Sequence, residues 1–163
     1  MTRPFACVVN LGCRVNRVES DRITSDLVGA GFSLVDQDEA DIIVINTCAV
    51  TGEAESKTRK AVRHALGLPR EPIVVVTGCV VNLHPNELTD LSPRVIAQPS
   101  KIDVARTAAD AAGLPARTVN LDEGHDLADL LGRSRLGVKV QDGCNNRCSY
   151  CICLLYTSPS PRD

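Results

Sequence analysis

Three cysteines near the C-terminal end of the sequence have a spacing that suits metal chemistry. Cys144, Cys148 and Cys151 follow the pattern C-x3-C-x2-C. Thiolates are soft ligands that favour zinc and iron–sulfur clusters, and three of them on one short loop can hold three corners of a cubane cluster. The fourth iron would then be open to a ligand that is not protein. The alternatives are a zinc site that lacks its fourth ligand and a disulfide cluster.

The spacing of this loop resembles the signature of the radical S-adenosylmethionine enzymes. The resemblance implies that S-adenosylmethionine binds the open iron through its amino and carboxylate groups. It further implies that an electron from the cluster splits the sulfonium and releases a 5′-deoxyadenosyl radical.

A second set of three cysteines follows the ends of expected strands: Cys13, Cys48 and Cys79. In an open parallel sheet all strand C-termini lie along one edge, where ligands bind. If these strands are neighbours at roughly 4.8 Å spacing, their loops can converge on one cluster. The alternative is three buried cysteines that behave as small hydrophobic side chains. Their three equivalent positions favour the ligand interpretation.

The chain has 163 residues and 8 cysteines. The apolar run at residues 5–11 has no cleavage site after it, so it predicts a strand rather than a signal peptide. Without a secretion signal, metal or redox chemistry is favoured over disulfides. Cys7 lies inside this run and is expected in the core. No spacing typical of a metal site links the histidines His64, His84 and His125.

The composition is that of a soluble globular protein, with 44% hydrophobic and 23% charged residues. Aromatic residues make up only 2%, so the core must consist of Val, Ile, Leu and Ala. The net charge of −2 argues against a general nucleic-acid clamp. No apolar run approaches the length of a membrane span, and we expect a cytoplasmic monomer.

Apolar runs alternate with helical patterns along residues 1–114. The expected strands are 5–11, 32–35, 41–46, 72–77 and 95–97. The expected helices are 16–30, with Asn16 and Glu19 as a capping pair, 51–66, 85–91 and 102–112. This alternation predicts an α/β fold with a flavodoxin-like or Rossmann-like parallel sheet and helices on both faces.

The chain resembles the tRNA methylthiotransferase family over nearly all of residues 1–152. Four motifs in the family's order carry the resemblance: Leu11-Gly12-Cys13-Arg14-Val15-Asn16 with Glu19-Ser20, Asn46-Thr47-Cys48-Ala49-Val50-Thr51 with Lys57-Thr58-Arg59, Thr77-Gly78-Cys79, and Gln141-Asp142-Gly143-Cys144-Asn145-Asn146. It implies two 4Fe–4S clusters, the auxiliary one on Cys13, Cys48 and Cys79 and the radical-generating one on Cys144, Cys148 and Cys151. The implied reaction adds a methylthio group to C2 of a modified adenosine beside the tRNA anticodon.

The motif Cys-Ala-Val-Thr with Lys-Thr-Arg is most similar to the branch that acts on N6-threonylcarbamoyladenosine. The isopentenyladenosine branch and the branch that modifies a ribosomal-protein aspartate are the alternatives. The implied partners are tRNA, mainly through C-terminal regions that the chain lacks, and donors of electrons and sulfur. A zinc or redox binding module without catalysis is the alternative of another class.

The family pattern stops after Ile152. Residues 153–163 are typical of a translated sequencing adapter, so we exclude Cys153 as a ligand. The expected organisation is an auxiliary-cluster domain at 1–114, a linker at 115–134, the start of a radical S-adenosylmethionine barrel at 135–152 and a non-native tail. One strand of a barrel cannot shield a reactive cluster, so we expect this chain to be inactive alone.

The helix expected at 51–66 also has a basic face, formed by Lys57, Lys60, Arg63 and Arg59. These side chains could contact substrate phosphate. The alternative is a solvated face whose cations are favoured by the helix dipole.

Overall fold

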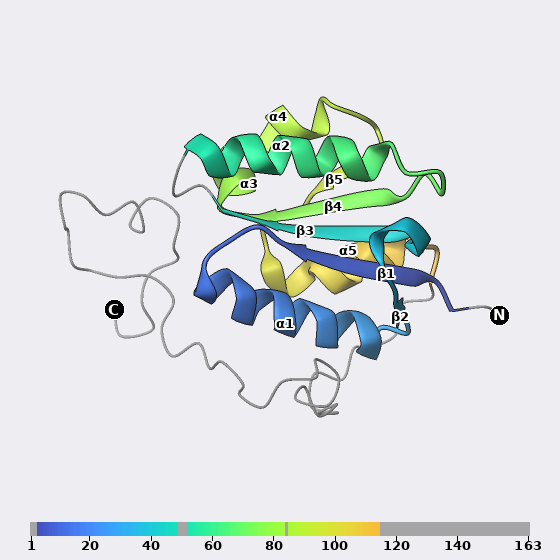
Figure 1. The fold of residues 1–163 in the computed structure, drawn as a ribbon. Coiled ribbons are helices and arrows are strands. Elements are labelled where there is room, and N and C mark those ends of the chain that lie inside the picture. The colour runs from blue at the N-terminus through green and yellow to red at the C-terminus, as the bar shows by residue number, and fades with distance from the viewer. Residues whose placement is uncertain (1–2, 49–51, 84, 115–163) are drawn as a thin grey trace, which may run out of the picture.

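The computed structural model describes residues 3–48, 52–83 and 85–114 of the chain (Figure 1). They form a parallel five-stranded sheet with the order β2-β1-β3-β4-β5. The strands are β1 (Phe5–Asn10), β2 (Ser33–Leu34), β3 (Ile42–Thr47), β4 (Ile73–Gly78) and β5 (Val95–Ala97). This is the strand order of flavodoxin-like folds, so the predicted fold class is confirmed.

Helices cover both faces of the sheet. They are α1 (Arg14–Gly29), α2 (Gly52–Leu66), α3 (Cys79–Leu83), α4 (Pro85–Thr89) and α5 (Val104–Ala111), with short 3-10 turns η1 (Gln37–Glu39) and η2 (Lys101–Asp103). Figure 1 shows α1 and α5 on one face and α2, α3 and α4 on the other. No helix in the described part of the chain is long and apolar enough to cross a membrane.

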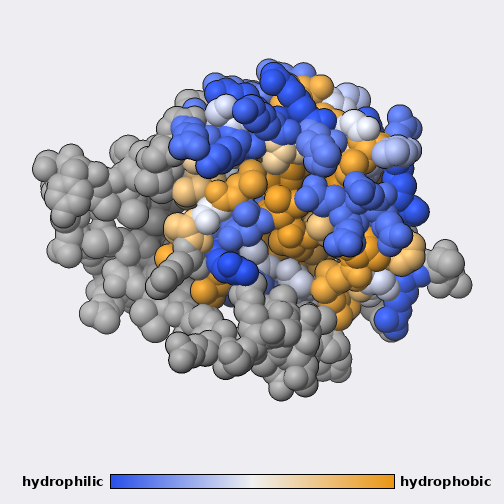
Figure 2. All heavy atoms as spheres, viewed as in Figure 1, coloured by the Kyte–Doolittle hydropathy of each residue, from blue (hydrophilic) through white to orange (hydrophobic). Residues whose placement is uncertain are grey.

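The two faces of β3 supply the centres of two apolar cores. Ile43 packs in the core that contains Val62 of α2, and Val44 packs in the core that contains Leu27 of α1. All six residues of β3 are buried, which explains why its first four residues, Ile42 to Ile45, are continuously apolar rather than alternating. Figure 2 shows apolar side chains between the two helical layers and polar side chains along the outer side of α2.

The start of α1 differs from the prediction. The helix begins at Arg14, with Cys13 at its N-cap position, and no side chain within the described residues caps it. Asn16 is therefore inside the helix and does not form a capping box with Glu19. Both side chains bond instead to residues far along the chain, Asn16 to the end of β3 and Glu19 to Lys101. Tertiary partners thus replaced the local pairing that the sequence pattern indicated.

Other expected elements are present with changed bounds. The strand expected at 32–35 is only two residues long, and the helix expected at 102–112 begins with the 3-10 turn η2. Helix α3, which begins at Cys79, was not predicted. Thr51, the expected first residue of the helix at 51–66, lies outside the described residues. So do the linker, barrel strand, cysteine loop and tail expected in residues 115–163.

Gly78, at the end of β4, is required by a close approach between strands. Its φ is +100°, and a Cβ there would overlap the carbonyl oxygen of Thr47. Gly113 also has a positive φ, of +67°, but a Cβ there would meet nothing within 4 Å. Both positions have a positive φ, but a Cβ overlaps other atoms only at Gly78.

We expect Gly78→Ala to destabilise the domain more than Gly113→Ala. Left-handed backbone costs an L-residue about 1–2 kcal/mol at both positions. The overlap at Gly78 adds a further cost of about 1–3 kcal/mol, by analogy with overpacking in cores. Urea denaturation of the two variants measures the difference. Equal losses of unfolding free energy would show that β3 and β4 can separate to accept a methyl group.

Candidate metal centre

The sheet register brings three cysteines to the same edge. Three residues lie opposite one another across β1, β3 and β4: Asn10, Asn46 and Thr77. Cys48 lies two residues after Asn46, and Cys79 lies two residues after Thr77. Cys13 lies three residues after Asn10. Because the strands are adjacent and parallel, the three cysteines lie at the carboxyl edge, as predicted.

The three side chains differ in their surroundings. Cys13 is exposed, Cys48 is buried with 6% of its surface accessible, and Cys79 is half-buried. All three carry thiols rather than disulfides. Within residues 3–48, 52–83 and 85–114, however, no three His, Cys, Asp or Glu side chains are grouped so as to hold a metal ion.

The chemistry of the donor set fits an iron–sulfur cluster or zinc, since three soft thiols share one edge. Their side chains would have to turn toward a common centre before they could bind it. That these cysteines bind a metal stays a prediction. Cys144, Cys148 and Cys151, the other predicted ligands, lie outside the described residues.

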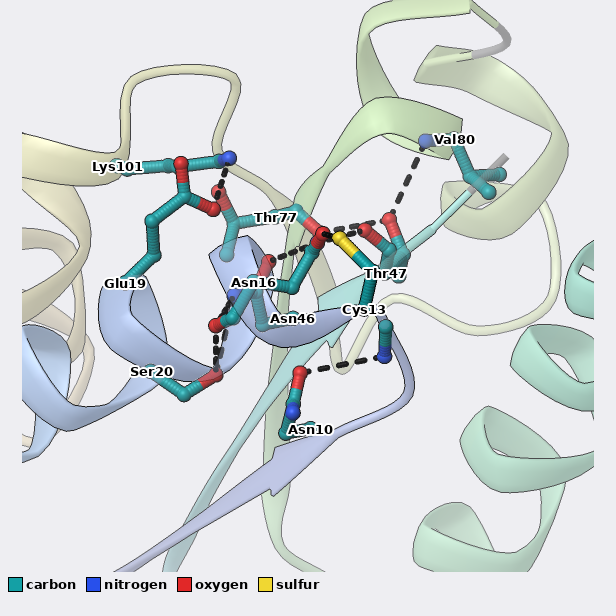
Figure 3. A network of polar contacts seen from close by, with 11 residues as sticks. Asn10, Cys13, Asn16, Glu19, Ser20, Asn46, Thr47, Thr77, Val80 and Lys101 are labelled. Atoms are coloured by element: carbon teal, nitrogen blue, oxygen red, sulfur yellow. Dashed lines mark hydrogen bonds and ion pairs between the residues drawn. The ribbon is translucent and has the colours of Figure 1, made fainter. Parts of the chain in front are cut away.

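A buried set of hydrogen bonds lies beside the cysteines; we call it the strand-end network, formed by Asn16, Ser20, Asn46 and Thr47 (Figure 3). Asn46 is fully buried, and its Nδ2 donates to the carbonyl oxygen of Asn16 at 2.9 Å and to Ser20 Oγ at 3.0 Å. Asn16 Nδ2 donates in turn to the carbonyl oxygen of Thr47 at 2.9 Å. The network therefore joins the first turns of α1 to the end of β3.

Thr47 extends the network to β4. Its hydroxyl donates to the carbonyl oxygen of Thr77 at 2.7 Å and accepts from the amide of Val80 at 3.3 Å. These two partners lie on either side of Gly78 and Cys79 in the chain. The start of α3, which carries Cys79, is thus fixed to the residue that precedes Cys48.

The hydroxyl of Thr77 contrasts with that of Thr47. Thr77 Oγ1 is buried and has no hydrogen-bond partner among the described residues. Figure 3 shows its side chain on the side of the Glu19–Lys101 ion pair, which connects α1 to η2. Asn46 and Thr47 were not predicted as site residues, although a pair of polar residues that ends a buried apolar strand is a usable signal.

Cys7 has a different environment from the edge cysteines. It lies in β1 and packs against the core on the α2 side, as predicted. Burial raises the pKa of the Cys7 thiol, and the nearby Asp36 carboxylate raises it further. Both effects oppose formation of the thiolate that a metal requires. Cys7 is therefore a suitable internal reference for the three edge cysteines.

The basic face of α2 is partly neutralised. Lys57 and Arg59 each form an ion pair with a glutamate, at 2.8 and 3.0 Å. Lys60 and Arg63 are exposed, and neither forms an ion pair with the described residues. These two cations are the ones that α2 leaves available to a ligand.

The chain matches a known family over more than half of its length. Residues 6–97 match the uncharacterized protein family UPF0004, and this range contains Cys13, Cys48 and Cys79. Relatives with curated names match nearly the whole chain. The ribosomal protein uS12 methylthiotransferase RimO of Chlorobaculum tepidum is 33% identical over 154 residues, which cover 91% of this chain and 34% of the relative.

Relatives named for a tRNA substrate match equally well. The threonylcarbamoyladenosine tRNA methylthiotransferase MtaB of Bacillus subtilis is 30% identical over 153 residues, covering 87% of this chain and 34% of that protein. MtaB of Chlamydia pneumoniae is 35% identical over 150 residues, covering 89% of this chain and 34% of that protein. The chain therefore spans about a third of the length of the curated relatives it matches.

The contrast between the two threonine hydroxyls yields a matched pair of variants. Thr47→Val removes two hydrogen bonds and leaves the buried carbonyl of Thr77 and amide of Val80 without that partner. We expect it to cost about 1–3 kcal/mol of unfolding free energy. Thr77→Val removes a hydroxyl that has no partner among the described residues, so we expect no loss or a small gain.

Chemical denaturation of both variants tests this expectation. Equal destabilisation would mean that the hydrogen bonds of Thr47 do not set the cost, because removal of a buried hydroxyl without a partner should not destabilise the fold.

Proposed function

Because the chain belongs to the methylthiotransferase family through its UPF0004 domain, we propose that it is the auxiliary-cluster domain of a radical S-adenosylmethionine methylthiotransferase. One observation carries this proposal. Three thiols follow three adjacent parallel strands at one edge of the sheet. Cys13, Cys48 and Cys79 would hold a 4Fe–4S cluster there, which when bound would present sulfur for transfer.

The radical chemistry is assigned to the second cysteine set. Cys144, Cys148 and Cys151 would hold the other 4Fe–4S cluster and, with it, S-adenosylmethionine. The spacing C-x3-C-x2-C supports this assignment. An electron donor and a sulfur donor are the further partners that the reaction needs.

The proposed substrate is N6-threonylcarbamoyladenosine next to the tRNA anticodon. The motif Cys-Ala-Val-Thr, with Lys57-Thr58-Arg59 after it, supports this branch. A ribosomal-protein substrate is the second candidate, because relatives named for that activity match the chain with a similar identity of 33%.

The face of α2 that carries Lys60 and Arg63 is the proposed contact with tRNA phosphate, with Lys57 beside it. Both cations are exposed and form no ion pair with the described residues. Such a contact adds affinity without sequence specificity, since phosphates are the same at every position.

Anaerobic reconstitution with iron and sulfide tests the auxiliary site. The starting chain has Cys144, Cys148 and Cys151 replaced by Ala, so that only the edge cysteines remain as a set. We expect it to bind about four irons per chain and to gain the visible absorption of a cubane cluster. Cys48→Ser should lose most of this iron, because it removes one of three protein ligands, and Cys7→Ser should keep it.

The same experiment separates the alternative class. A chain that binds zinc but assembles no iron–sulfide cluster would be a zinc module, and the proposed function would be wrong. Equal losses of iron in Cys48→Ser and Cys7→Ser would also contradict the assignment of ligands.

Binding of a tRNA transcript across a salt series tests the α2 contact. The double variant Lys60→Gln/Arg63→Gln should bind tRNA more weakly. The plot of log K against log salt should also be less steep by about one to two, because each lost phosphate contact releases one counterion fewer. Arg17→Gln with Arg22→Gln is the matched control, since it removes two exposed charges from α1 on the opposite face. If both double variants weaken tRNA binding equally, the loss comes from the change in net charge and not from a contact at α2.

A further inference from the structure

One side-chain amide contacts two parts of the cysteine edge. Asn16 is buried, with 4% of its surface accessible. Its Oδ1 accepts a hydrogen bond from the Cys13 thiol at 3.1 Å, and its Nδ2 donates to the carbonyl oxygen of Thr47 at 2.9 Å. Thr47 directly precedes Cys48, so the amide of Asn16 joins Cys13 to the residue before the second edge cysteine. Figure 3 shows Cys13, Asn16 and Thr47 in contact.

The position of Asn16 is itself fixed by its neighbours. Asn46 donates to its carbonyl oxygen at 2.9 Å and lies 3.4 Å from its Nδ2. A Cβ at Gly12 would overlap the side chain of Asn16, so the loop before Cys13 passes directly over the amide. Asn16 therefore cannot turn away without displacing this loop or breaking the strand-end network.

The two hydrogen bonds of the Asn16 amide respond differently to metal binding by Cys13. A thiol can donate to Oδ1, whereas a metal-bound thiolate has lost its proton to solvent and cannot. The bond to Cys13 is thus confined to the metal-free chain. The bond from Nδ2 to the Thr47 carbonyl involves no ligand atom and is available in both forms.

We propose that Asn16 is a positioning residue for the three-cysteine site, holding the Cys13 loop at a fixed spacing from the strand end that carries Cys48. The proposal rests on the proposed function, because it assigns Asn16 a role toward the metal that these cysteines bind. Asn16 holds the Cys13 thiol before binding and keeps the two ligand-bearing segments together afterwards.

The rate of iron loss to a chelator tests the second role. The starting chain again has Cys144, Cys148 and Cys151 replaced by Ala and is reconstituted with iron and sulfide. Asn16→Ala should lose iron about 10- to 100-fold faster, the range typical when residues behind metal ligands are removed. Ser20→Ala is the matched control, because it removes hydrogen bonds from the strand-end network without contacting Cys13 or Thr47. It should lose iron no more than about twofold faster.

Alkylation of the metal-free chain tests the first role without a cluster. Peptide mass spectrometry follows the reaction of iodoacetamide with Cys13, and Cys7 serves as the internal reference. Asn16→Ala should raise the Cys13 rate about two- to tenfold relative to Cys7, the factor that one hydrogen bond is worth. Ser20→Ala should leave this ratio unchanged.

Asn16→Asp separates the two contacts and serves if Asn16→Ala does not fold. It keeps an oxygen for the Cys13 thiol, but as an ionised carboxylate it cannot donate to the Thr47 carbonyl. We expect faster iron loss with no rise in Cys13 alkylation.

Iron loss from Asn16→Ala or Asn16→Asp at the rate of Ser20→Ala would overturn the proposal. If the starting chain binds no iron at all, the proposed function fails instead. In that case an unchanged alkylation ratio in Asn16→Ala would overturn the role of Asn16 as well.

Discussion

The hydrogen bonds between Asn16 and Asn46 join the two segments from which the candidate site is built. A buried amide must have partners, because an unsatisfied polar group costs about 1–3 kcal/mol. Asn46 is fully buried at the end of β3, and it obtains its partners from α1. This requirement fixes how α1 begins against the sheet, and with it the loop that carries Cys13. Thr47 makes the corresponding connection to β4 and the loop that carries Cys79.

The sheet and the cysteine edge could be predicted because their signals are local or topological. The apolar run of β3 is long enough to identify a buried strand, and parallel strands place the residues after them at one edge. The role of Asn16 could not be predicted in this way. Asn16 followed by Glu19 has the pattern of a capping box, but Asn16 bonds to Thr47, 31 residues away, and Glu19 bonds to Lys101, 82 residues away. Only the strand order shows that such partners are close.

The different exposures of the three cysteines could not be read from the sequence either. Cys13, Cys48 and Cys79 each follow a strand, yet one is exposed, one buried and one half-buried. Cys13 and Cys79 also differ in the helix that each one begins. Cys13 is the N-cap residue of a long helix, and Cys79 is the first residue of a five-residue helix. Strand topology therefore determines at which edge the thiols lie, but it does not determine how open each one is to solvent.

The position of the strand-end network also explains how a site of this kind can exist before any metal is bound. Three thiols near one another contribute little attraction of their own, so other interactions must hold their loops in place. The core residues do this for the strands, but they end at Ile45 on β3 and Val76 on β4. Beyond them the polar residues Asn46 and Thr47 continue the connection with directed hydrogen bonds. Directed bonds fix spacing more narrowly than apolar contacts, which tolerate small shifts. The polar residues at this end of the sheet are therefore suited to holding the cysteine-bearing segments at a fixed spacing.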